Sequence, residues 1–72
     1  MKTFYLNDDW FAADAIASIH RDCFHSNHYL PFRIVITYKY NCNQVIYDYK
    51  TESERDIQFT TLVSRWQRAC QD

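Results

Sequence analysis

Polar and apolar residues alternate with a period of two through the middle of the chain, and this pattern predicts two β-strands. In residues 32–40, one face carries aromatic or branched side chains and the other is mostly polar. Alternation of this kind is typical of a strand with one buried face. Residues 45–49 alternate in the same way. The Asn-rich link at 41–43 suits a tight turn, so the two runs predict an antiparallel hairpin.

The last third of the chain changes to a helical period. Its apolar residues recur at i, i+3, i+4, i+7 and i+11, which places them on one face of a helix. They are Phe59, Leu62, Val63, Trp66 and Cys70. Thr51 and Glu54 have capping-box spacing, and acidic residues in the first turn suit the helix dipole. We predict a helix from about Glu52 to Gln71 whose apolar face covers the hairpin.

The first third of the chain allows two interpretations. Residues 3–6 form a short strand in both. In the first interpretation, residues 9–11 extend that strand, residues 13–15 make a one-turn corner, and residues 16–24 form a second strand. In the second, residues 10–24 form a helix, which their four alanines favour. The fold is therefore α+β, either a β-meander of about four antiparallel strands with one C-terminal helix, or a β-α-β-β-α arrangement.

Three short motifs favour the first interpretation by resemblance. They are Tyr-Leu-Asn followed by Trp-Phe within residues 5–11, Ala-Asp-Ala-Ile-Ala-Ser-Ile at 13–19, and Tyr-Lys-Thr-Glu-Ser-Glu-Arg-Asp-Ile-Gln-Phe at 49–59. The order resembles short phage and bacterial proteins of mostly unknown function, in which a four-stranded meander is closed by a C-terminal helix. The resemblance implies a small accessory protein that binds a host protein and inhibits or modulates a defence or transcription complex. It supplies no catalytic residue.

Composition narrows the class of protein further. A chain of 72 residues makes one domain, and a net charge of −1 gives no overall field that attracts nucleic acid. No apolar run approaches the length of a membrane span, and the N-terminus lacks a signal-peptide core. Three cysteines, an odd number, argue against a secreted disulfide framework. These features predict a cytoplasmic protein, in the host cytoplasm if a phage encodes it, with no membrane partner.

One cluster of residues has the chemistry of a metal site. His20, Cys23, His25 and His28 offer the nitrogen and sulfur ligands that zinc prefers. A strand places Cys23 and His25 on one face and His20 on the other, and neither a strand nor a helix brings all four together. The simpler interpretation is a small buried cysteine beside solvated histidines. We therefore expect no cofactor, and we expect no enzymatic activity because no nucleophile or phosphate-binding loop is evident.

The aromatic content points to a partner. So small a core cannot bury all thirteen aromatic side chains, six Tyr, five Phe and two Trp. Exposed aromatic residues favour protein contacts. The sequence predicts a protein-binding surface formed by Trp10, Phe11, Tyr29, Phe32, Tyr38 and Tyr40. The edges of an open sheet can also pair two copies into a homodimer.

Nucleic-acid binding is the alternative function. Arg33, Lys39 and Lys50 fall where they can line the outer face of the sheet, with tyrosines nearby for base stacking. The nine acidic residues offset the eight basic ones, so an ordinary solvated face explains the same pattern.

Overall fold

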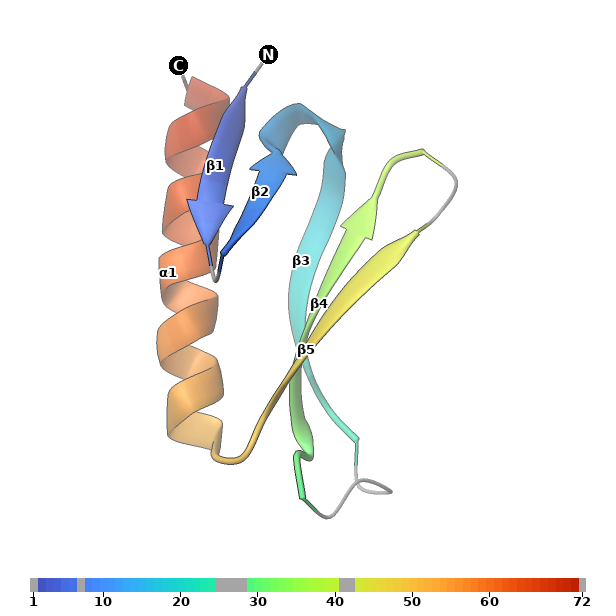
Figure 1. The fold of residues 1–72 in the computed structure, drawn as a ribbon, viewed down its shortest axis with the longest axis vertical. Helices are drawn as coiled ribbons and strands as arrows, with labels where there is room; N and C mark the ends of the chain where they lie inside the picture. The colour runs from blue at the N-terminus through green and yellow to red at the C-terminus, as the bar shows by residue number, and fades with distance from the viewer. Residues whose placement is uncertain (1, 7, 25–28, 41–42, 72) are drawn as a thin grey trace.

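The computed structural model describes residues 2–6, 8–24, 29–40 and 43–71, which form five β-strands, a 3-10 turn and one α-helix (Figure 1). The strands lie in two antiparallel sheets, β1–β2 and β3–β4–β5. Their bounds are β1 Thr3–Leu6, β2 Asp9–Ala12, β3 Ile16–Cys23, β4 Phe32–Tyr38, β5 Gln44–Tyr49 and α1 Glu52–Gln71. The predicted α+β class with a C-terminal helix is confirmed. The β-α-β-β-α alternative is wrong, because residues 10–24 contain no α-helix.

The beginning of the chain differs from the predicted meander. Residues 9–11 do not extend the first strand; they lie in a separate strand that turns back and pairs with it, from Thr3 opposite Ala12 to Leu6 opposite Asp9. The reversal includes Asp8, whose φ of 64° lies in the left-handed region that Asp tolerates. The described part of the chain thus forms five strands in two sheets, where about four in one meander were expected.

The predicted corner at residues 13–15 is present as a 3-10 turn, labelled η1. Ala13 is only 1% exposed there. Its N–H donates to the Lys2 carbonyl at 2.8 Å, and its carbonyl accepts from Trp66 Nε1 at 2.9 Å. Alanine suits this position because a larger side chain would collide with the elements that enclose the corner. The corner therefore fixes the angle at which β2 passes into β3.

The three-stranded sheet follows the predicted alternation. Strands β4 and β5 pair antiparallel from Phe32 opposite Tyr49 to Thr37 opposite Gln44, which confirms the hairpin. Ile34 and Ile36 are fully buried on the inner face. The link at 41–42 lies outside the described residues. The predicted run of 32–40 is longer than the strand, which ends at Tyr38.

Helix α1 packs on the inner side of both sheets, beside β1, and its end lies near the start of the chain (Figure 1). The Thr51 hydroxyl accepts the Glu54 N–H at 3.1 Å, as the capping-box spacing predicted. Leu62 is fully buried, whereas Cys70, expected to complete the apolar face, is exposed and Ala69 is buried instead. Among the described residues, no helix combines the length and the apolar character needed to cross a membrane. The core consists of Phe4, Leu6, Phe11, Ala13, Ile16, Ile34, Ile36, Leu62 and Ala69.

Candidate protein-binding surface

An exposed aromatic pair lies on the outward side of the β1–β2 hairpin. Tyr5 and Trp10 are cross-strand neighbours, with ring centroids 5.1 Å apart and planes inclined by 49°. Trp10 is 72% exposed and Tyr5 is 42% exposed. The other face of the hairpin carries Phe4 and Phe11, which stack at 5.2 Å and are buried in the core. We call the outward residues Thr3, Tyr5, Trp10 and Ala12 the hairpin face.

The hairpin that carries this pair is fixed to the rest of the fold. Tyr47 of β5 donates its hydroxyl to Asp9 Oδ2 at 2.6 Å, and Arg65 of α1 donates to the Tyr5 carbonyl at 2.6 Å. Lys2 Nζ donates to the Cys70 carbonyl at 2.7 Å, which ties the chain start to the helix end. Because these bonds come from both the sheet and the helix, the aromatic pair is held in a defined position before any partner arrives.

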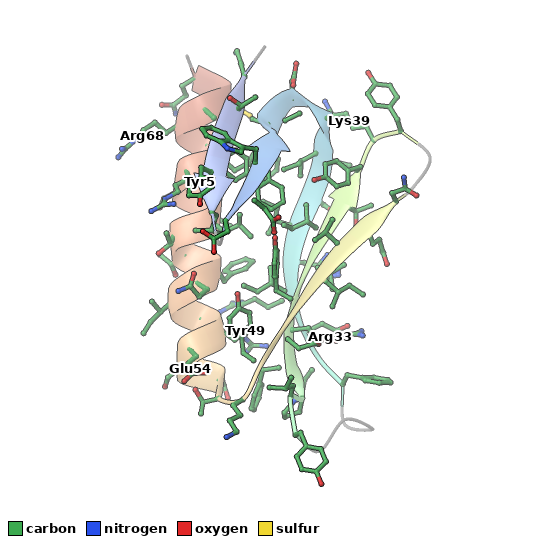
Figure 2. The ribbon with its side chains drawn as sticks, viewed as in Figure 1. Tyr5, Arg33, Lys39, Tyr49, Glu54 and Arg68 are labelled. Carbon is green, nitrogen blue, oxygen red and sulfur yellow. The ribbon has the colours of Figure 1, made fainter. Side chains whose placement is uncertain are left out.

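Charged groups flank the hairpin face on two sides. The Tyr5 hydroxyl donates to Asp8 Oδ1 at 2.7 Å, and this hydrogen bond to a carboxylate raises the pKa of Tyr5. On the helix side, an open hollow of about 160 Å³ between β1 and α1 is lined by Thr3, Phe4, Arg65, Arg68 and Ala69. Figure 2 shows Arg68 extending from α1 into solvent, at about the same level along the helix as Tyr5. The pair thus lies between carboxylates at the hairpin tip and guanidinium groups on the helix.

The other predicted partner residues do not gather at this surface. Phe11 is 3% exposed and belongs to the core, because the alternation that turns Trp10 outward turns the next residue inward. Phe32 and Tyr38 are half-buried. Tyr29 and Tyr40 are exposed, but they lie beyond opposite ends of β4. Of the six predicted residues, only Trp10 therefore belongs to the hairpin face.

The predicted metal ligands are not assembled in the described part of the chain. His20 and Cys23 are three residues apart on β3 and so point to opposite faces, and both are exposed. The expectation that Cys23 is buried is wrong. His25 and His28 lie outside the described residues. Within the described residues, no group of three or more His, Cys, Asp or Glu side chains is placed to hold a metal ion.

The three basic residues of the nucleic-acid alternative lie apart. Arg33 is half-buried on the outer face of the sheet, where it pairs with Asp22 and lies 4.9 Å above the Phe24 ring. The bond from Arg33 lowers the pKa of Asp22. Lys39 and Lys50 directly follow two antiparallel strands and therefore lie toward opposite ends of the sheet. Figure 2 shows the separation of Arg33 from Lys39.

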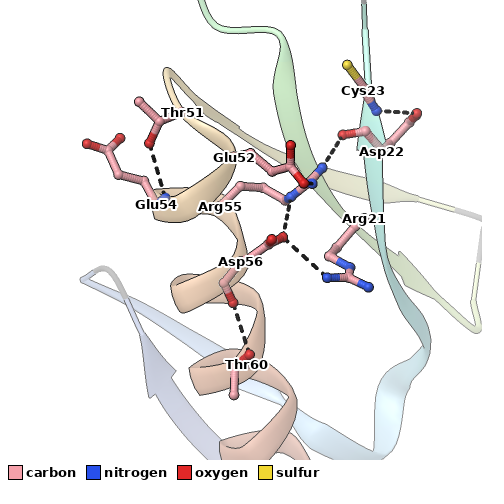
Figure 3. Close-up of polar contacts among 9 residues, drawn as sticks. All are labelled: Arg21, Asp22, Cys23, Thr51, Glu52, Glu54, Arg55, Asp56 and Thr60. Carbon is pink, nitrogen blue, oxygen red and sulfur yellow. Dashed lines mark hydrogen bonds and ion pairs between the residues drawn. The ribbon is translucent and has the colours of Figure 1, made fainter.

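A buried cation, Arg55, joins the start of α1 to β3 (Figure 3). It is 8% exposed and donates to the Asp22 carbonyl at 2.8 Å and to Asp56 Oδ1 at 2.9 Å. Its guanidinium carbon lies 5.3 Å from the centre of the Phe32 ring. This residue was not identified from the sequence, because the apolar face of the helix was defined by hydrophobic residues alone. A signal was present, since Arg55 precedes Phe59 by four residues and so shares the apolar face of the helix.

Comparison of the chain with protein-family models, with curated proteins and with solved structures finds no match.

Proposed function

We propose that this protein is a non-enzymatic protein-binding module and that the hairpin face is its contact surface. The observation that carries the proposal is the exposed Tyr5–Trp10 pair on a hairpin fixed by the sheet and the helix. Tryptophan, tyrosine and arginine are the residues that most often dominate the energy of protein interfaces. Arg65, which bonds to the Tyr5 carbonyl, and Arg68, which lines the hollow between β1 and α1 with it, supply the third of these types.

The energetics favour a partner that covers the indole. A tryptophan side chain can bury about 150–250 Å², and most of that area is uncovered at Trp10. Covering the rest of the ring would contribute about 3 kcal/mol at ~25 cal/mol per Å². Since the hairpin is already ordered, little of this gain is lost to ordering on binding.

The partner is proposed to be a host protein with an acidic border around an apolar pocket. The apolar pocket would receive Trp10, and the acidic border would pair with Arg65 and Arg68 and set the orientation. The resemblance to short phage and bacterial proteins supports a narrower form of the proposal, in which binding sterically blocks a host defence or transcription complex.

The test compares two equally exposed aromatic residues. Trp10 is 72% exposed and Tyr40 is 71% exposed, but Tyr40 lies away from the hairpin face. The wild type, Trp10→Ala and Tyr40→Ala would each be immobilised and exposed to nuclease-treated host lysate, and the retained proteins would be quantified by mass spectrometry. We expect one retained partner that Trp10→Ala loses by about tenfold or more and Tyr40→Ala keeps.

Circular dichroism of each variant would first establish that the fold is intact. A partner retained equally by Trp10→Ala would refute the hairpin face as the contact surface. A different result would support the nucleic-acid alternative. In that case, proteins from untreated lysate would be retained, their retention would fall steeply as salt is added, and nuclease treatment of the lysate would abolish it.

A further inference from the structure

Strand β5 ends the three-stranded sheet and presents an open edge. The Tyr38 N–H donates to the Asn43 carbonyl at 2.9 Å, which makes these two residues a hydrogen-bonded pair of the β4–β5 ladder. Hydrogen-bonded pairs recur at every second residue of an antiparallel ladder. The residues of β5 that bond to β4 are therefore Val45, Tyr47 and Tyr49. The backbone N–H and C=O groups of the alternate residues, Gln44, Ile46 and Asp48, point away from the sheet, where no described strand pairs with them.

The edges of β1 and β3 carry features that oppose strand addition. On β1, Arg65 of the helix bonds to the Tyr5 carbonyl. On β3, the register shifts between Ile16 and Ser18, and three successive polar residues follow Ile19. Residues 44–49 contain no proline, no lysine and no register shift. Edge strands that lack such protection are the ones that pair with another chain.

We propose that the occupant of this edge is the β5 strand of a second copy of the chain, paired antiparallel about a two-fold axis through Ile46. This register sets Ile46 opposite Ile46 of the second copy. It also sets Gln44 opposite Asp48, so that an amide donor meets a carboxylate. On the inner face, Val45 lies opposite Tyr47. Each cross-strand pair is chemically matched, and the arrangement joins two three-stranded sheets into one continuous sheet.

The sequence of β5 disfavours the neighbouring registers. The outward-pointing N–H and C=O groups of one β5 strand must meet those of the other. In every allowed register, therefore, a residue of the set Gln44, Ile46 and Asp48 lies opposite another residue of that set. A shift to either adjacent allowed register sets Ile46 against Gln44 or against Asp48. A shift that centres the pair on Asp48 brings two carboxylates together. The register centred on Ile46 is the one that joins apolar to apolar and donor to acceptor.

The outer face of the sheet supports the same register. Val35 of β4 is 3% exposed although it faces outward between His20 and Ile46, and Ile46 is 43% exposed. Pairing through Ile46 would extend this apolar row across the two-fold axis, from Val35 of one copy to Val35 of the other. The contact would add about six backbone hydrogen bonds. It is small compared with permanent interfaces, so the dimer should be weak and reversible.

The test compares substitutions of two exposed isoleucines, one on the proposed dimer contact and one away from it. Ile46 lies on the β5 edge, whereas Ile57 is 65% exposed on α1. Sedimentation velocity would be run from about 10 µM to about 1 mM on the wild type, Ile46→Lys and Ile57→Lys. We expect a monomer–dimer equilibrium in the wild type and in Ile57→Lys, and at least a tenfold weaker dimer in Ile46→Lys, because the substitution places two lysines opposite each other.

Hydrogen exchange of the wild type provides a second measurement that needs no variant. The amides of Gln44, Ile46 and Asp48 should gain protection as concentration rises, whereas those of Val45 and Tyr47 should be protected at every concentration. A wild type that stays monomeric at about 1 mM would overturn the proposal. A dimer that Ile46→Lys does not weaken, or one that forms without added protection at the three amides, would overturn it too. This inference is independent of the proposed function, since the hairpin face belongs to the other sheet.

Discussion

Replacing Arg55 with alanine should destabilise this fold more than removing any exposed cation. The side chain is 10% exposed, so its polar bonds form where little water can replace them. The substitution removes the bond to the Asp22 carbonyl, the bond to Asp56 and the contact with the Phe32 ring. It also removes the packing of the long alkyl stem. These contacts connect the first turn of α1 with the end of β3 and the start of β4.

The size of the effect follows from these contacts. A buried hydrogen bond from a charged donor contributes about 1.5–3 kcal/mol, and a cation over an aromatic ring contributes about 0.5–2 kcal/mol, more where water is excluded. The pair with Asp56 is partly exposed and adds about 0–1 kcal/mol. Since such terms are not additive, we expect a loss of about 2–4 kcal/mol in the free energy of unfolding. A domain of this length has a total stability of about 4–11 kcal/mol, so the loss is a large fraction of it.

Urea denaturation followed by far-ultraviolet circular dichroism would measure the effect. The midpoint should fall for Arg55→Ala with an unchanged dependence on urea concentration. Arg55→Met keeps much of the alkyl stem but not the polar bonds. Its urea midpoint should lie between those of the wild type and Arg55→Ala. Arg68→Ala is the matched control, because Arg68 is exposed near the helix end; its effect should stay within about 0.5 kcal/mol. Equal midpoints for Arg55→Ala and Arg68→Ala would refute a net stabilising role for the buried contacts.

Three further substitutions test how the elements are joined. Tyr47→Phe removes the bond to Asp9 and should lower the free energy of unfolding by about 0.5–1.5 kcal/mol at neutral pH. Burial raises the pKa of Tyr47 above its ordinary value of 10.0, so the stability that the wild-type tyrosine adds is present below pH 10.0 and declines above it. Urea titrations should therefore show a shallower alkaline decline for the variant. For Asp22, whose pKa the Arg33 bond holds below 3.8, the added stability is present above pH 3.8 and is lost as the pH falls further, so Asp22→Asn should flatten the acid side of the same curve. Trp66→Phe removes the hydrogen bond from the indole to the Ala13 carbonyl and should lower the melting temperature, measured by calorimetry. The expected decrease is about 4–8 °C for each kcal/mol lost from the free energy of unfolding.

The sheet and the helix could be predicted because their patterns are long. Strand β4 has seven residues and α1 has twenty, so the period is evident and a single unusual residue does not change the result. The first hairpin could not be predicted in this way, because each of its strands has four residues. Among the described residues, its reversal includes a non-glycine residue with a positive φ, Asp8. The chain contains no glycine, so the most common signal for such a reversal is missing.

The candidate surface was predicted only in part for the same reason. Once residues 9–12 are known to be a strand, alternation alone places Trp10 outward and Phe11 inward. The predicted surface grouped the two rings because both lie next to the corner at residues 13–15, although residues 9–11 were already expected to be extended. Tyr5, the actual neighbour of Trp10, became apparent only from the pairing of β1 with β2.

The structure also changes the meaning of the high aromatic content. Most of the aromatic side chains have a structural role: Phe4 and Phe11 are in the core, while Tyr38, Tyr47, Tyr49, Phe59 and Trp66 pack against it. Phe24 and Phe32 lie beneath arginine side chains. Aromatic abundance is therefore not evidence for a binding surface by itself. What distinguishes Trp10 is that a large indole remains 72% exposed on a hairpin held by hydrogen bonds from both the sheet and the helix. These bonds stabilise the fold, and they also hold the exposed ring in a fixed position, which is the kind of preorganisation from which binding gains affinity.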